Sequence, residues 1–161
     1  TLSHDMDMAL AFGGPIAEVM TRGAANLDER FTELGKPDTT VMSIQFERGA
    51  LGIIENRLQT TFGYETVLEV SGSKGKGVVR DDARDDLTVL RADQSQRAFV
   101  PWFLERYAQA YREEIAAFVT ALHDGETPEL GARQGIEVLR ACLAAELSYR
   151  EGRPVAPGEL A

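Results

Sequence analysis

The middle of this 161-residue chain consists of short stretches in which apolar and polar residues alternate, separated by tight turns. Residues 39–47 alternate in this way, and residues 50–60 run back after a turn at Arg48-Gly49. A period of two is typical of a strand with one buried face. Strands joined by such short turns pair antiparallel, because a parallel pair needs a crossover of about a dozen residues or more. The pattern therefore predicts an antiparallel sheet at the centre of the fold.

Other parts of the chain have strand or loop patterns. Further strands are predicted at residues 16–24, 63–71 and 87–92, and at Val78-Val79 after a second turn at residues 71–75. The segment from Asn26 to Asp38 has no clear period and is interpreted as a loop. The run from Arg80 to Asp86 mixes charges of both signs and is interpreted as a solvated charged loop.

Three segments have the period of helices: residues 4–12, 101–125 and 131–148. The last two each carry one apolar stripe, composed of Leu104, Tyr107, Tyr111, Ile115, Phe118 and Leu122 in one and of Ile136, Leu139, Leu143 and Leu147 in the other. Both helices are therefore expected on one face of the sheet, which leaves the other face available for oligomerisation. The predicted class is α+β, with a large, mostly antiparallel sheet, and residues 155–161 are expected to form a loose tail.

Composition and charge limit the function classes. The formal net charge of −9 disfavours nucleic acids and anionic membranes as partners, and no apolar run approaches the length of about 20 residues that spans a bilayer. A single cysteine suits a reducing compartment, so a cytoplasmic protein is expected. The chain starts at Thr1 with neither an initiator Met nor a signal segment, which suggests an end made by cutting.

His4 is the first candidate for chemistry, because an imidazole can accept a proton near neutral pH. It also fits a structural or solvent-facing role beside a helix start. A metal site with Asp5 and Asp7 is disfavoured, since this spacing converges poorly on one ion. Residues 72–77 lack the spacing of a phosphate-binding loop, and no Gly-x-Gly-x-x-Gly opens a helix, so no nucleotide site is visible. Cys142 is interpreted as a core residue.

The segment from Glu55 to Glu65 concentrates amide, guanidinium and aromatic groups. Asn56, Phe62 and Tyr64 could bind a polyhydroxylated ligand through hydrogen bonds and ring contacts. Phe62 and Tyr64 fit sheet packing equally well.

Together these segments resemble the C-terminal domain of the Gfo/Idh/MocA oxidoreductase family, nearest to inositol 2-dehydrogenases, over residues 1–154. The stretches that carry the resemblance are His4-Asp5-Met6-Asp7, residues 46–52 with Ile54-Glu55-Asn56, Gly63-Tyr64-Glu65 with residues 69–75, the helix from Phe103, and residues 150–154.

The resemblance implies an enzyme that oxidises a secondary alcohol of a cyclitol or sugar with NAD or NADP. It implies a Rossmann domain before Thr1, so no cofactor is expected on this chain, and no activity from the chain alone. His4 matches the histidine of the catalytic Asp-x-x-x-His pattern, whose aspartate would precede Thr1, and the catalytic lysine would lie in the Rossmann domain. Tyr64 matches a substrate-pocket position, and Phe62 stands where some inositol dehydrogenases carry Tyr.

The resemblance also implies a homo-dimer or homo-tetramer formed through the sheet. Two other classes stay open. One is a non-enzymatic ligand-binding or assembly module, in which His4 is incidental. The other is a fragment of a metal-dependent sugar isomerase.

Overall fold

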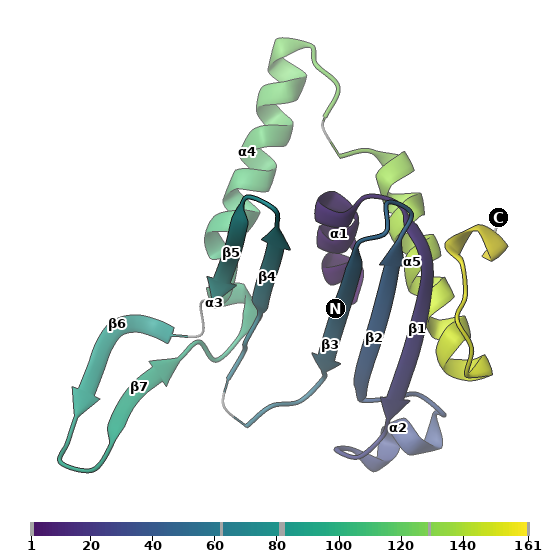
Figure 1. The fold of residues 1–161 in the computed structure, drawn as a ribbon. Helices are drawn as coiled ribbons and strands as arrows, with labels where there is room; N and C mark the ends of the chain where they lie inside the picture. The colour runs from purple at the N-terminus through teal and green to yellow at the C-terminus, as the bar shows by residue number, and fades with distance from the viewer. Residues whose placement is uncertain (1, 62, 81–82, 129, 161) are drawn as a thin grey trace. The chain divides into compact units, whose positions relative to one another are not determined.

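The computed structural model describes residues 2–61, 63–80, 83–128 and 130–160 (Figure 1). The chain folds as two compact units, the first made of residues 1–59 and 129–161 and the second of residues 60–128. The class is α+β, and the strand pairs within the described ranges are antiparallel, as the sequence predicts. These strands form one sheet of three strands and two sheets of two strands.

The first unit contains the three-stranded sheet, in the order β1 (Ile16–Ala24), β2 (Thr39–Phe46) and β3 (Leu51–Arg57). In the turn between β2 and β3, Gly49 has a φ of +84°, which residues with a Cβ atom rarely adopt. The register pairs Met42 with Ile54. All three predicted strands are confirmed, although β3 ends three residues before the expected position.

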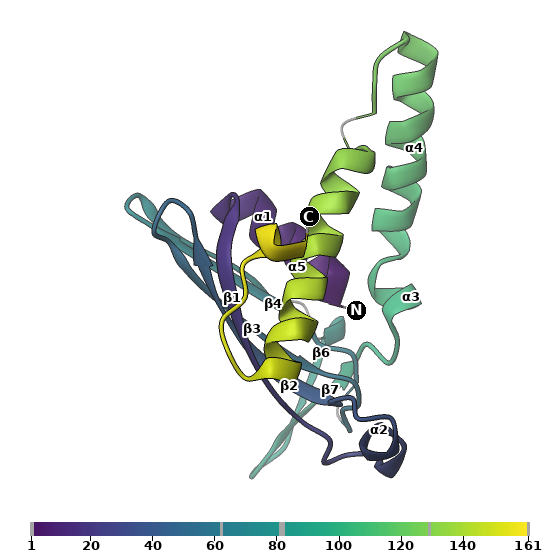
Figure 2. The same ribbon diagram turned by 90° about the vertical axis from the view of Figure 1, so that its right-hand side faces the viewer.

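Two helices, α1 (Leu2–Gly13) and α5 (Ala132–Glu151), cover one face of this sheet (Figures 1 and 2). Along β2, alternate residues are buried and the residues between them are exposed, and along β3 the alternate residues are half-buried. The buried core consists of Met6, Ile16, Val19, Met42, Ile44, Phe46, Ala141, Ala144, Ala145 and Val155. Burial of this shared apolar face holds the helices on the sheet.

The buried face of α5 differs from the predicted one. Ile136, Leu139 and Leu143 are between 44% and 57% exposed, while Ala141, Ala144 and Ala145 are buried. Small side chains let α5 approach β1 closely, so the helix turns its alanine face to the sheet. The expectation that the leucine stripe forms this contact is wrong for these three residues.

Residues from the C-terminal part of the chain occupy the outer edge of β1. Val19 and Val155 exchange two backbone hydrogen bonds of 2.9 Å each, and Val155 is fully buried. Two residues further along β1, the Thr21 N–H donates to the Ser148 hydroxyl over 2.9 Å. A short 3₁₀ helix, η1 (Pro157–Leu160), follows. Instead of a loose tail, this segment is therefore packed along the sheet edge.

A buried carboxylate organises the connection between β1 and β2. The Asp38 side chain accepts the backbone N–H groups of Asn26, Leu27 and Asp28, and Asp28 in turn caps the short helix α2 (Glu29–Glu33). The interpretation of residues 26–38 as loop alone is wrong for this helix. Five residues are too few to show an apolar period, which is why the pattern missed it.

The second unit contains two hairpins. β4 (Val67–Gly72) pairs with β5 (Gly75–Arg80), and β6 (Ala83–Leu90) pairs with β7 (Ser95–Phe99). The charged-loop interpretation is wrong from Ala83 onward, where β6 has already begun, and Asp81 and Asp82 lie outside the described residues. β7 was not predicted, and β4 starts four residues later than expected.

The single helix predicted over residues 101–125 is two helices, α3 (Phe103–Arg106) and α4 (Ala108–Asp124). Tyr107 interrupts them with a φ of −109° and a ψ of +18°. Gly125 ends α4 in the left-handed conformation, with a φ of +70°. Along α4, Tyr111, Ile115, Phe118 and Leu122 are exposed. Among the described residues, every helix is too short or too polar to span a bilayer.

Candidate functional site

His4 lies in the first turn of α1, and its side chain is exposed. Met6, two residues later, is fully buried in the core of the first unit and fixes the rotation of the helix. Because successive helical residues are about 100° apart around the axis, burial of Met6 turns His4 away from the core. The ring is therefore accessible to a ligand at the start of α1.

Asp5 and Asn56 meet where α1 begins and β3 ends. Both side chains are half-buried, and the Asn56 amide is near enough to lower the pKa of the Asp5 carboxyl. Burial raises the pKa of Asp5 above its usual value, against the lowering effects of the Asn56 amide and of His4. The sequence named Asp5 only as a candidate metal ligand, since contact with a residue 51 positions away leaves no mark in a local pattern.

Tyr64 belongs to the second unit, where it precedes β4. Its backbone N–H donates to the Val100 carbonyl oxygen over 2.8 Å, and its ring packs edge-on against Tyr107 with centroids 5.9 Å apart. Phe103 adds a second ring contact at 6.4 Å. The Tyr107 hydroxyl donates to Thr66 over 3.0 Å. Tyr64 is thus held on a small aromatic cluster at the start of α3 and α4.

The predicted site residues therefore fall into two groups. His4 and Asn56 are in the first unit, and Tyr64 is in the second. Phe62, the remaining candidate, lies outside the described residues.

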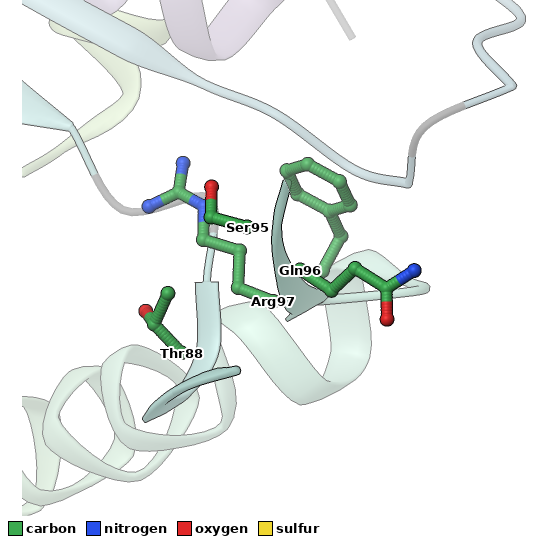
Figure 3. Close-up of a pocket in the computed structure, with 5 residues that line it drawn as sticks. Thr88, Ser95, Gln96 and Arg97 are labelled. Atoms are coloured by element: carbon green, nitrogen blue, oxygen red, sulfur yellow. The ribbon is translucent and has the colours of Figure 1, made fainter. Parts of the chain in front are cut away.

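A surface pocket lies on the β6–β7 hairpin and is lined by Thr88, Ser95, Gln96, Arg97 and Phe99 (Figure 3). The Arg97 guanidinium carbon lies 5.6 Å from the centre of the Phe99 ring, a cation–π contact. None of the site residues predicted from the sequence lines this pocket.

Metal and thiol chemistry find little support in the first unit. Among the described residues, no three histidine, cysteine, aspartate or glutamate side chains are grouped so that they could hold an ion. Cys142 on α5 is half-buried. Burial raises the pKa of its thiol, and the nearby Asp5 carboxylate raises it further. A thiol in that state is a poor nucleophile at neutral pH, in keeping with a packing role.

Comparison with known proteins connects this geometry to a family. Residues 1–156 match the family described as "Oxidoreductase family, C-terminal alpha/beta domain", the Gfo/Idh/MocA C-terminal domain. This chain belongs to the Gfo/Idh/MocA oxidoreductase family. The resemblance found in the sequence is confirmed, and the α+β class with its antiparallel sheets is the fold of this domain.

Individual family members show how much of the protein the chain represents. Myo-inositol 2-dehydrogenase from Thermotoga maritima is 36% identical over 155 residues, which make up 94% of this chain and 46% of that protein. The scyllo-inositol 2-dehydrogenase (NAD(+)) of Bacillus subtilis is 28% identical over 153 residues, with 94% and 45% covered. The crystal structure of a probable dehydrogenase from Thermotoga maritima matches with a TM-score of 0.93 at 32% identity, covering 99% of this chain and 49% of that one. The chain spans about half the length of these Gfo/Idh/MocA proteins.

Proposed function

We propose that this chain is the substrate-binding and oligomerisation domain of an NAD(P)-dependent dehydrogenase that oxidises a secondary alcohol of a cyclitol or sugar. Family membership and the inositol dehydrogenases among its relatives support this reaction class. The observation that carries the proposal is the exposed imidazole of His4 at the start of α1. A proton acceptor must reach the substrate, and a ring sealed in the core could not.

His4 is the proposed proton acceptor. Alcohol oxidation removes a hydride from the carbinol carbon and a proton from the hydroxyl group. The nicotinamide cofactor, carried by the half of the protein that precedes this domain, takes the hydride. A neutral imidazole within hydrogen-bond distance of the hydroxyl takes the proton. The preceding half would also supply an aspartate that orients the ring and a lysine that stabilises the developing alkoxide.

Asn56 and Tyr64 are proposed to bind other hydroxyl groups of the substrate. An amide both donates and accepts hydrogen bonds, and a phenol combines a hydroxyl with an apolar ring face, which suits a cyclitol. Phe62 supplies ring contact without a hydroxyl. The ring contacts of Tyr64 with Phe103 and Tyr107 support a fixed position for its ring within the second unit.

The proposed enzyme is a cytoplasmic homo-dimer or homo-tetramer formed through the sheet. On the sheet face opposite the helices, Val41, Leu51 and Ile53 are 47%, 81% and 77% exposed, and their burial would favour association. The domain alone is proposed to be inactive and to bind no nicotinamide nucleotide, which calorimetry with NAD tests directly. Measurable NAD binding by this chain would contradict that part of the proposal.

The deciding experiment replaces His4 by alanine in the full-length protein and measures NAD-dependent oxidation of myo-inositol and scyllo-inositol. Loss of the proton acceptor is expected to lower kcat by a factor of about 10² or more. His123→Ala is the matched control, since this exposed histidine on α4 contacts the adjacent Asp124 and has no proposed role. Wild-type turnover by the His4→Ala variant would remove His4 from the mechanism. A wild-type protein that binds cyclitols without oxidising them would instead favour a non-enzymatic binding module.

A further inference from the structure

Tyr107, the residue between α3 and α4, reaches with its side chain the segment that carries Tyr64. Its backbone has a φ of −109° and a ψ of +18°, which interrupts the helix. Its ring lies edge-on against the Tyr64 ring, with centroids 5.9 Å apart and 86° between the ring planes. Its hydroxyl donates to the Thr66 hydroxyl over 3.0 Å. One side chain therefore engages two residues of the segment that leads into β4.

The segment presents Tyr64 and Thr66 on the same side. From Tyr64 to Val70, alternate residues are half-buried, and the residues between them are exposed. In an extended chain such alternation places residues two positions apart on one face. The backbone of Tyr64 is held separately, because its N–H group donates to the Val100 carbonyl oxygen over 2.8 Å. The contact with Tyr107 therefore acts on the Tyr64 side chain.

Tyr107 is itself held in two ways. The Arg106 guanidinium carbon lies 5.1 Å from the centre of the Tyr107 ring, a cation–π contact. The hydrogen bond to Thr66 fixes the other end of the side chain. Thr66, Arg106 and Tyr107 are all half-buried, which reduces competition from water. A ring held over its face and at its hydroxyl offers Tyr64 a fixed surface, and edge-on packing favours one relative orientation of the two rings.

We propose that Tyr107 is a positioning residue: it holds the Tyr64 ring in the orientation in which the phenol hydroxyl binds a hydroxyl group of the substrate. This inference rests on the proposed dehydrogenase function, which gives Tyr64 its role. A side chain that is ordered before the substrate arrives loses less conformational entropy on binding than one that the substrate must order. The role of Tyr107 therefore concerns substrate affinity, and the chemical step is left to His4.

The test uses variants of the full-length protein, with kcat and KM for myo-inositol measured with NAD. Calorimetry in the presence of NADH, where no turnover occurs, gives Kd for myo-inositol. Tyr107→Leu removes the ring, so KM and Kd are expected to rise about tenfold, the effect of ordering one more side chain on binding. The kcat value is expected to stay within about threefold, because His4 is unchanged. Tyr111→Leu is the control, since Tyr111 is an exposed residue one turn further along α4.

Two milder variants test the hydrogen bond alone. Tyr107→Phe keeps the ring and loses only the bond to Thr66, so KM and Kd are expected to rise about threefold. Thr66→Val loses the same bond from the other side and should match it. Wild-type Kd values in both variants would overturn the proposal, which keeps the test decisive if Tyr107→Leu does not fold.

A double-mutant cycle with Tyr64→Phe separates positioning from structural support. This change removes the hydroxyl that Tyr107 orients, so adding Tyr107→Leu should raise KM and Kd by less than about twofold further. A further tenfold rise would overturn the proposal, since Tyr107 would then act independently of the Tyr64 hydroxyl. A lower Tm in Tyr107→Leu with unchanged KM and Kd would overturn it too. Failure of the proposed function looks different, since it appears as an unaltered kcat in His4→Ala.

Discussion

Replacing Ser148 by alanine removes one hydroxyl that links three parts of the first unit. The Ser148 Oγ accepts the Thr21 N–H over 2.9 Å and donates to the Arg153 carbonyl oxygen over 2.6 Å. Ser148 is fully buried and Thr21 is 4% exposed, so water cannot readily replace the lost acceptor. Arg153 is exposed, and its carbonyl oxygen can be hydrated. The cost is therefore dominated by one orphaned, buried N–H group.

A buried donor without a partner costs about 1–3 kcal/mol, so Ser148→Ala is expected to lower the free energy of unfolding by about 2 kcal/mol. For a chain of this length, that corresponds to a fall in Tm of about 4–8 °C. Urea unfolding followed by circular dichroism measures the first quantity and calorimetry the second. Hydrogen exchange adds a local readout, since the Thr21 amide should exchange faster by a factor of about 30.

Ser43→Ala is the matched control, because Ser43 is exposed on the opposite face of the sheet. Its effect is expected to stay within about 0.5 kcal/mol. If Ser148→Ala changes the free energy of unfolding by no more than this control, and the Thr21 amide keeps its protection, the hydroxyl is not the acceptor that completes the edge of β1.

Three further predictions concern other polar or backbone features. Thr21→Val should raise the free energy of unfolding by about 1 kcal/mol, as measured by urea unfolding, because the buried Thr21 hydroxyl has no hydrogen-bond partner among the described residues. A clear loss of stability in this variant would show that the hydroxyl does have a partner. Burial would raise the pKa of Asp38, but three backbone N–H groups and the Thr39 hydroxyl outweigh it and hold this pKa below the usual value. The stabilisation that the ionised Asp38 carboxylate gives the folded state is thus complete above the unfolded pKa of about 4 and is lost as the pH falls through the lower folded pKa. The backbone amides of residues 26–28 should therefore lose protection from hydrogen exchange in acid. Asp38→Asn should abolish that pH dependence. Gly63→Ala should destabilise the second unit by about 1–3 kcal/mol, since Gly63 has a φ of +93° and an added Cβ would lie 2.8 Å from the Val100 carbonyl oxygen. Gly77→Ala is the control, because a Cβ added there would lie in open space. Unfolding followed by Trp102 fluorescence measures both variants, and equal transitions would contradict the predicted strain at Gly63.

The parts of the fold that were predictable are those with a strong local period. Alternation identified β2, because one face of this strand is buried and the other is exposed, and the turn at Arg48-Gly49 located β3. The period of three and four found α5 but selected the wrong buried face. Large apolar side chains dominate a sequence pattern, whereas close approach to β1 favours alanine.

The site was predictable only in part, for a related reason. His4 could be named from its chemistry, and its position in the first turn of α1 follows from local sequence. The partnership of Asp5 with Asn56 depends on packing between a helix and a strand that are distant in sequence. The same holds for Ser148 at the edge of β1, since an isolated serine in a helix carries no pattern that points to a strand.

The way β1 is closed has a consequence for self-association of this domain. Strand addition needs a free row of backbone N–H and C=O groups, and on β1 that row is bonded to Val155 and Ser148. Within the described residues, β3 pairs only with β2. Proteolytic removal of residues 153–160 would take away the Val155 pairing and expose this edge of β1, where a strand of a second copy could then add.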